Sequence, residues 1–185
     1  MPLTTLDSGC ALIVIDLQRG IVSLPTVHPA EEIVARAAAL ADAFRSQGLP
    51  VVLVNVTGAA PGRSDVVAKR SPASDWHVLV DALNPVASDI LISKQCWGVF
   101  TTTHLDTMLR ARGVSQVVLA GISTSIGVES TARSASELGY NVVFASDAMT
   151  DLSAESHQHS LTKIFPRLGE VTTSTELLTQ LEQTR

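Results

Sequence analysis

Polar residues that could do chemistry follow three separate apolar runs of this sequence. Asp16 and Lys94 each come after one such run, and the segment 121–127, which begins and ends with glycine, follows a third. In an open parallel sheet, ligands bind where the strands end. A carboxyl group can transfer a proton, and a neighbouring lysine can bind an anion. A strand-to-helix turn offers backbone N–H groups to negative charge. These three features therefore predict one site for a small molecule.

The chemistry of Asp16 depends on its surroundings. Five apolar residues precede it, so burial should raise its pKa unless a cation compensates, and Lys94 is the candidate cation. The alternatives are structural: Asp16 as the cap of a nearby loop or helix, Lys94 as a solvated strand end, and residues 121–127 as a polar connection. Residue types and spacing leave both interpretations open.

The elements that must position these residues alternate regularly along the chain. β-branched apolar runs without polar alternation predict strands covered on both faces, at residues 11–15, 51–54, 90–92, 117–120 and 142–145. Apolar residues at helical spacing predict helices at residues 31–47, 103–112, 128–138, 153–165 and from about 174. This alternation predicts a three-layer α/β/α sandwich around a mostly parallel, Rossmann-like sheet, in a single domain of residues 1–185. Residues 57–75 predict a long loop.

The composition narrows the classes of function. The 185 residues carry a net charge of −5, which does not favour binding to nucleic acid. The apolar stretches are strand-sized, the first residues lack the features of a signal peptide, and two cysteines are too few for a disulfide framework. We therefore expect a cytoplasmic protein that binds neither nucleic acid nor membrane. The sequence contains no nucleotide-binding motif and no metal-ligand spacing, so no cofactor and no metal are expected.

Three blocks in order carry a family resemblance: residues 14–18 (VIDLQ), 93–100 (SKQCWGVF) and 121–132 (GISTSIGVESTA). They resemble the signature of the isochorismatase-like hydrolases, and the similarity extends over about residues 11–168. The resemblance implies a doubly wound parallel sheet, homodimers or homotetramers, and an active site of Asp, Lys and usually Cys. Asp16 and Lys94 match the first two, whereas Gly127 occupies the position of the cysteine.

This glycine changes the mechanism that the resemblance implies. In the cysteine members a thiolate at the helix start attacks amides, carbamoyl compounds or ureido acids, and Gly127 has no side chain to do so. True isochorismatases also carry glycine here and cleave a vinyl ether without a covalent intermediate. Protonated Asp16 would then deliver a proton to the methylene carbon of the substrate, and water would capture the oxocarbenium-like centre, releasing pyruvate. The resemblance also implies a cis peptide in this turn, at Ile122–Ser123.

A positive charge on Lys94 conflicts with this role of Asp16. A nearby ammonium lowers the pKa of a carboxyl group, whereas a general acid needs that pKa raised. Our hypothesis is that carboxylates of the substrate neutralise Lys94 when they bind.

Other groups could carry the chemistry instead. Cys96, two residues from Lys94, could be a relocated nucleophile, although free cysteines are usually small buried apolar residues. Ser123 or Ser125 with Asp147 and a downstream histidine would follow the chain order of a serine hydrolase, but the closing glycine of a nucleophile elbow is missing. That histidine would be His157 or His159. The alternative from another class is a non-catalytic protein of this fold that binds a small molecule.

We predict a cofactor-independent hydrolase that uses water to cleave a small carboxylated molecule. The expected catalytic residues are Asp16, Lys94 and Gly127, and residues 123–127 are expected to supply N–H donors. The expected substrate-binding residues are Gln18, Trp97, Ser123, Thr124 and Ser125.

Overall fold

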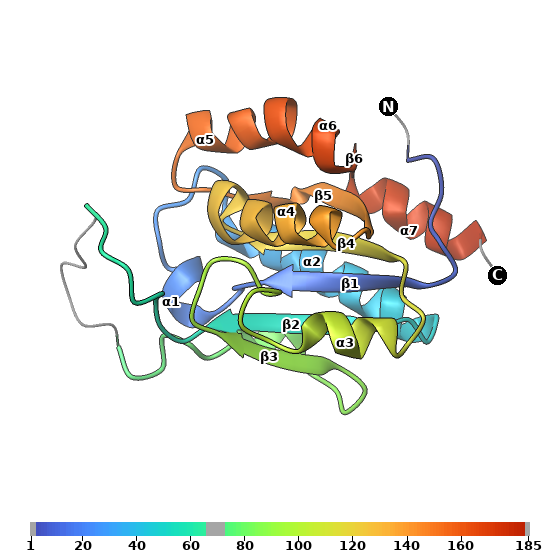
Figure 1. Cartoon of the computed structure of the whole chain (residues 1–185), viewed down its shortest axis with the longest axis horizontal. Helices are drawn as coiled ribbons and strands as arrows, with labels where there is room; N and C mark the ends of the chain where they lie inside the picture. The colour runs from blue at the N-terminus through green and yellow to red at the C-terminus, as the bar shows by residue number, and fades with distance from the viewer. Residues whose placement is uncertain (1–2, 66–72, 184–185) are drawn as a thin grey trace.

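A six-stranded parallel sheet runs through the centre of the protein (Figure 1). The computed structural model describes residues 3–65 and 73–183. The strands are β1 (Cys10–Ile15), β2 (Val51–Val56), β3 (Ile90–Lys94), β4 (Gln116–Ile122), β5 (Asn141–Thr150) and β6 (Glu170–Thr172). Their order in the sheet is β3-β2-β1-β4-β5-β6, and every neighbouring pair is parallel.

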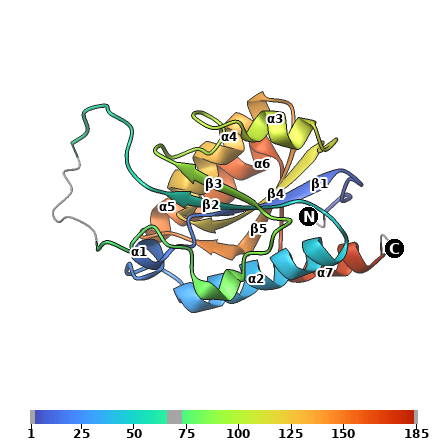
Figure 2. The same cartoon turned by 90° about the horizontal axis from the view of Figure 1, so that it is seen from below.

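Helices cover both faces of the sheet (Figure 2). One face packs against α2 (Ala30–Ser46) and α7 (Ser174–Gln183), and the other packs against α3 (Leu105–Arg110), α4 (Glu129–Glu137) and α6 (Phe165–Leu168). Side chains of a strand point alternately to the two faces, so Val14 of β1 lies in the first core and Ile15 in the second. The remaining α-helices are α1 (Arg19–Val22) and α5 (Ala154–His159), and η1 (Asp81–Leu83) is a 3₁₀ turn. No helix in the described part of the chain is long and apolar enough to cross a membrane.

The predicted fold class is confirmed, with three differences in detail. The sheet is entirely parallel, and its sixth strand, β6, was not predicted because three residues with one central valine give no apolar run. Strand β5 extends well beyond the predicted residues 142–145, because it continues to Thr150 and contains Asp147. The helix expected at 153–165 is interrupted by a π turn at Ser160–Ile164, and helical structure continues past Pro166 in α6. Of the loop expected at residues 57–75, residues 66–72 lie outside the described part of the chain.

The order of the strands creates a crevice between the carboxyl ends of β1 and β4. From β1 the chain proceeds to β2 and β3 on one side, then returns to β4 and proceeds to β5 and β6 on the other. Connections leave β1 and β4 in opposite directions at such a point, so a ligand can enter between them. Asp16 follows β1 at this crevice, and the turn that contains Gly127 follows β4.

Gly121 allows the two strands to approach each other here. Its φ is +123°, and a Cβ at this position would overlap the backbone oxygen of Ile15. An alanine would therefore have to adopt an unfavourable backbone conformation and also push β1 away from β4.

We expect Gly121→Ala to lower the free energy of unfolding by more than about 3 kcal/mol, because strain and steric overlap add. Denaturant unfolding followed by circular dichroism measures this difference. Gly48→Ala is the matched control, because Gly48 also has a positive φ of 69° but no atom lies within 4 Å of its added Cβ. It should cost only about 1 kcal/mol. Equal effects of the two substitutions would contradict the proposed close approach at Gly121.

Candidate active site

Asp16 is placed by a sharp turn of the chain directly after β1. Its φ of +53° lies in the left-handed region, which is uncommon for residues other than glycine and more accessible to Asp than to most. The backbone N–H of Asp16 donates to Val54 O at 2.9 Å, and its backbone oxygen accepts from the N–H of Gln18 at 2.9 Å. The residue is 5% exposed, so its carboxyl group lies at the sheet edge and is almost removed from water.

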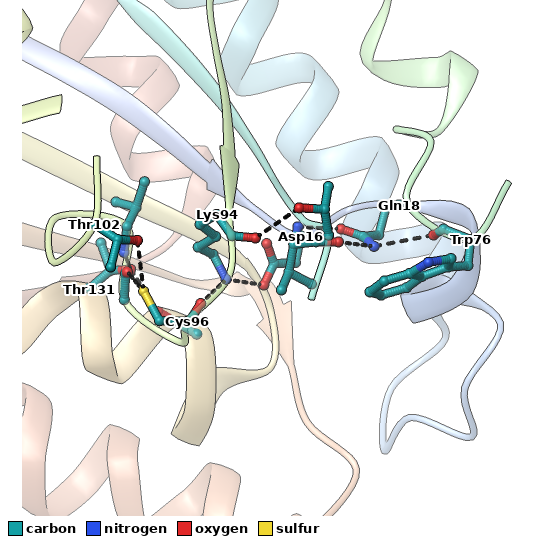
Figure 3. A network of polar contacts seen from close by, with 12 residues as sticks. Asp16, Gln18, Trp76, Lys94, Cys96, Thr102 and Thr131 are labelled. Atoms are coloured by element: carbon teal, nitrogen blue, oxygen red, sulfur yellow. Dashed lines mark hydrogen bonds and ion pairs between the residues drawn. The ribbon is translucent and has the colours of Figure 1, made fainter. Parts of the chain in front are cut away.

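A buried ion pair joins Asp16 to Lys94 at the end of β3 (Figure 3). The distance from Lys94 Nζ to Asp16 Oδ2 is 2.7 Å, and Lys94 is 2% exposed. Lys94 Nζ also donates to the backbone oxygen of Cys96 at 3.2 Å. Asp16 Oδ1 is buried and has no hydrogen-bond partner among the described residues. Buried polar atoms are normally hydrogen-bonded, so this oxygen is the one suited to hold a proton or to meet a substrate.

Burial outweighs the lysine in setting the pKa of Asp16. The pKa of Asp16 is raised from 3.8 to about 6, because loss of hydration raises it more than the charge and hydrogen bond of Lys94 lower it. The sequence predicted that burial and Lys94 would shift the pKa of Asp16 in opposite directions. Burial has the larger effect, so the pKa is raised. Near pH 6, Asp16 is present in both protonation states and can serve as an acid or a base.

Gly127 completes this group from the turn after β4. A Cβ at Gly127 would lie 3.2 Å from Asp16 Oδ2 and 3.7 Å from the backbone oxygen of Trp97. The same Cβ would come to 2.9 Å from Cγ2 of Ile15, closer than such atoms normally approach. The structure thus brings Asp16, Lys94 and Gly127 together, and it holds a backbone rather than a side chain against the ion pair at residue 127.

The turn itself is a π turn, Thr124–Val128, that leads into α4. The peptide bond Ile122–Ser123 is cis, as the family resemblance implied. The expected N–H donors are largely engaged within the protein: the Ser125 N–H donates to Asp151 Oδ2 at 2.7 Å, and those of Ile126 and Val128 donate to Ser123 O at 3.1 Å. Two of the anticipated donors, the N–H groups of Ser125 and Ile126, are therefore not available to a substrate in this conformation.

A pocket of about 250 Å³ opens above the ion pair. Ser123 and Trp97 line it, as do the three residues of the site, and Trp97 is 64% exposed. Side chains that the sequence did not single out form much of the remaining wall: Ile21, Leu24, Val56, Trp76, Ile126 and Leu152. Leu24, Trp76 and Leu152 lie in loops whose course the sequence pattern does not define, although an apolar residue in a loop was a usable signal.

Three residues expected to bind substrate do not line this pocket. Gln18 is fully buried: its Nε2 donates to the backbone oxygens of Val56 and Trp76, and its Oε1 accepts from the Val56 N–H at 2.8 Å. It therefore joins the end of β2 to the segment around Trp76 (Figure 3). Thr124 is also fully buried, and neither it nor Ser125 lines the pocket.

Thr131 is a polar residue at this site that the sequence reasoning missed. Its Oγ1 donates to the backbone oxygen of Gly127 at 2.7 Å and accepts from the Val99 N–H at 3.3 Å. Thr131 thus connects the turn after β4 to the loop after β3, which carries Cys96 and Trp97. Its position four residues after Gly127 was the available signal, because a helical Thr often bonds to the oxygen four residues back.

The groups of the serine-hydrolase alternative do not converge. Asp147 accepts from the N–H of Ser174 at 2.6 Å and from its hydroxyl at 2.7 Å, at the start of α7. Nδ1 of His157 lies 2.8 Å from Oγ1 of Thr124, a residue that was not a candidate nucleophile. His159 is exposed.

Cys96 lines the pocket, but its thiol is bonded elsewhere. Its Sγ lies 3.1 Å from the backbone oxygen of Gly98 and 3.3 Å from Oγ1 of Thr102 (Figure 3). Among residues 3–65 and 73–183, no three His, Cys, Asp or Glu side chains are grouped to hold a metal ion.

Known proteins of one family are similar to this chain over nearly its whole length. The isochorismatase domain matches residues 10–176. The uncharacterized isochorismatase family protein YecD of Escherichia coli O157:H7 is 46% identical, covering 92% of this chain and 95% of that protein. An isochorismatase family protein from Burkholderia thailandensis has a solved structure with a TM-score of 0.92 and 42% identity, covering 98% of this chain and 99% of the other. The maleamate amidohydrolase of Pseudomonas putida is 30% identical, covering 92% of this chain and 86% of that enzyme.

Removing the ammonium should raise the pKa of Asp16 further. In Lys94→Met the carboxyl stays buried but loses the cation that lowers its pKa, so we expect this pKa to move upward from about 6. A pH titration of the Asp carboxyl carbons by NMR measures it. Arg133→Met is the control, because Arg133 pairs with Glu129 on an exposed part of α4. An unchanged or lower Asp16 pKa in Lys94→Met would refute this electrostatic balance.

Proposed function

This chain belongs to the isochorismatase family, and from that premise we propose that it hydrolyses a small carboxylated molecule by direct attack of water. Asp16 transfers the proton, and Lys94 binds the negative charge of the substrate. The observation that carries the proposal is the buried, unpartnered Oδ1 of an aspartic acid whose pKa is about 6, at the floor of a pocket.

The glycine at residue 127 favours a route without a covalent intermediate. A thiol nucleophile needs a side chain here, and Gly127 has none. Even a single Cβ at this position would press against Cγ2 of Ile15 at 2.9 Å. Water is therefore the nucleophile that we propose.

Cleavage of a vinyl ether is the reaction that best fits a carboxylic acid without a nucleophile. Protonated Asp16 gives its proton to the terminal methylene carbon, and the electron pair of the double bond forms the new C–H bond. Water adds to the resulting oxocarbenium carbon and loses a proton to ionised Asp16. The hemiketal then breaks its C–O bond to give a ketone and an alcohol, and Asp16 is ready for the next turnover.

Substrate charge completes the electrostatics of this cycle. In the free protein, Lys94 Nζ is bonded to ionised Asp16 and to the backbone oxygen of Cys96. An ammonium has three donors, so a substrate carboxylate can approach the third. A bound anion neutralises Lys94 and favours the protonated form of Asp16, which is the form that the chemistry needs.

Hydrolysis of an amide is the second candidate, favoured by the 30% identity to a maleamate amidohydrolase. Asp16 would then act as a base that removes a proton from water, and its ionised form would be the active one. The two candidates therefore predict opposite dependence of the rate on pH.

For vinyl-ether cleavage, we expect kcat/KM to decrease about tenfold per pH unit above about pH 6, because only protonated Asp16 delivers the proton. The decrease in kcat should occur at higher pH, because the bound carboxylate raises the pKa of Asp16 in the complex. Rates measured on vinyl ethers, amides and ureido acids from pH 4 to about pH 9 test this. A rate that increases through pH 6 would refute the acid role and support the amide candidate.

Asp16→Asn should lower kcat/KM at least about 100-fold, because the amide can neither deliver nor accept the proton. Asp147→Asn is the matched control: it replaces an aspartate of β5 that bonds to Ser174, and Asn retains an acceptor oxygen. Full activity of folded Asp16→Asn would refute the mechanism. Binding without turnover of any compound by the wild-type protein would support a non-catalytic member of the fold.

Cys96→Ser should keep at least about half of the wild-type activity, because the thiol points to Gly98 and Thr102 and does not react. A fluorophosphonate probe should leave no adduct on the wild-type protein by intact mass spectrometry, because His157 is bonded to Thr124 rather than to Ser123 or Ser125. Loss of activity in Cys96→Ser, or a serine adduct, would contradict direct attack by water and support a covalent mechanism.

A further inference from the structure

We propose that His157 is a positioning residue, which holds the Thr124–Val128 turn against the Asp16–Lys94 ion pair through its hydrogen bond to Thr124. His157 lies on α5 and does not line the pocket. Its Nδ1 is 2.8 Å from Oγ1 of Thr124, and both side chains are buried. The bond therefore links a helix outside the pocket to the first residue of the turn.

The position of this turn determines how well Asp16 is shielded. Three residues after Thr124, the turn brings Gly127 so close that a Cβ there would lie 3.2 Å from Asp16 Oδ2. A turn that moved outward by the width of a water molecule would expose the carboxyl group. The hydrogen bond of Thr124 is thus one connection on which the exclusion of water depends.

A second bond fixes the neighbouring residue from the same side. The Ser125 N–H donates to Asp151 Oδ2 at 2.7 Å, and Oδ1 of Asp151 accepts from the N–H of Leu152 at 2.8 Å. Leu152 in turn lines the pocket. Helix α5 and the connection that precedes it therefore bond to two successive residues of the turn, and the connection also supplies part of the pocket wall.

The surroundings of His157 keep its ring neutral and in place. Burial, followed by the effect of His28, lowers the pKa of His157, and Asp151 acts in the opposite direction. The ring of His28 lies 5.0 Å away at 60°, and Nδ1 of His28 is 3.0 Å from Oγ1 of Thr150. A neutral imidazole can bond to the Thr124 hydroxyl in either tautomer. The ring thus fills the space between the turn and the loop that contains His28.

The test is the pKa of Asp16, which a merely structural histidine far from the ion pair would not change. In His157→Ala and in Thr124→Val the turn loses its bond, water approaches Asp16, and its pKa should decrease from about 6 by about one unit. NMR titration of the Asp carboxyl carbons measures this without any substrate. The result is therefore independent of the proposed hydrolysis.

Conservative and control variants separate positioning from a general loss of stability. Thr124→Ser and His157→Asn keep a polar group near the bond and should keep the Asp16 pKa within about 0.3 units of the wild-type value. His159→Ala, on the same helix but exposed, should leave it unchanged. The double variant His157→Ala/Thr124→Val should shift the pKa no further than either single change, because both remove one bond.

Kinetics provide a second readout if the protein proves to be a hydrolase. His157→Ala and Thr124→Val should lower kcat about tenfold and change KM less than about twofold, because the turn is misplaced while the pocket wall remains. Folded Thr124→Val with the wild-type Asp16 pKa would overturn the proposal. An unchanged Asp16 pKa in folded His157→Ala would also overturn the proposal. If His157→Ala does not fold, the result for Thr124→Val is sufficient to test it.

Discussion

The buried pair of Asp16 and Lys94 is the interaction on which the architecture of this site depends. Removing two opposite charges from water is costly, and their mutual attraction only partly offsets that cost. The raised pKa of Asp16 shows the imbalance directly: burial has the larger effect and Lys94 the smaller. Such a pair contributes little to stability, so its presence at the topological switch point is explained better by chemistry than by folding.

Several features of the fold shield the Asp16–Lys94 pair from water and hold its two side chains in place. The backbone contact between Gly121 and Ile15 brings β1 and β4 together, and Gly127 then lies directly against the carboxyl group. On the other side, Gln18 bonds to the backbone of Val56 and Trp76 and closes the turn after β1. Thr131 and Thr124 hold the two ends of the turn after β4. Gln18, Thr131 and Thr124 are buried and polar, and each connects segments that are distant in the sequence.

The sequence was sufficient to predict the architecture and the central residues, but not the environment of those residues. Long β-branched runs predicted five of the six strands because such runs can be buried only in a sheet covered on both faces. The proximity of Asp16, Lys94 and Gly127 was predictable because Asp16 and Lys94 stand at strand ends and all three residues lie in ordered motifs. Gln18 and Thr124 stand in the same motifs, yet their side chains point into the protein. Whether a polar side chain faces the pocket or the backbone depends on loop geometry, which no periodicity encodes. The balance between burial and the lysine charge likewise required the coordinates.

Both tryptophans of the chain, Trp76 and Trp97, line the single pocket that contains the ion pair. Tryptophan fluorescence of the native protein therefore originates entirely from the walls of this pocket. Any compound that enters it alters the polarity around one indole or both, so occupancy can be followed without a label and without knowledge of the reaction. Intrinsic tryptophan fluorescence can therefore be used to screen compounds for binding to this pocket.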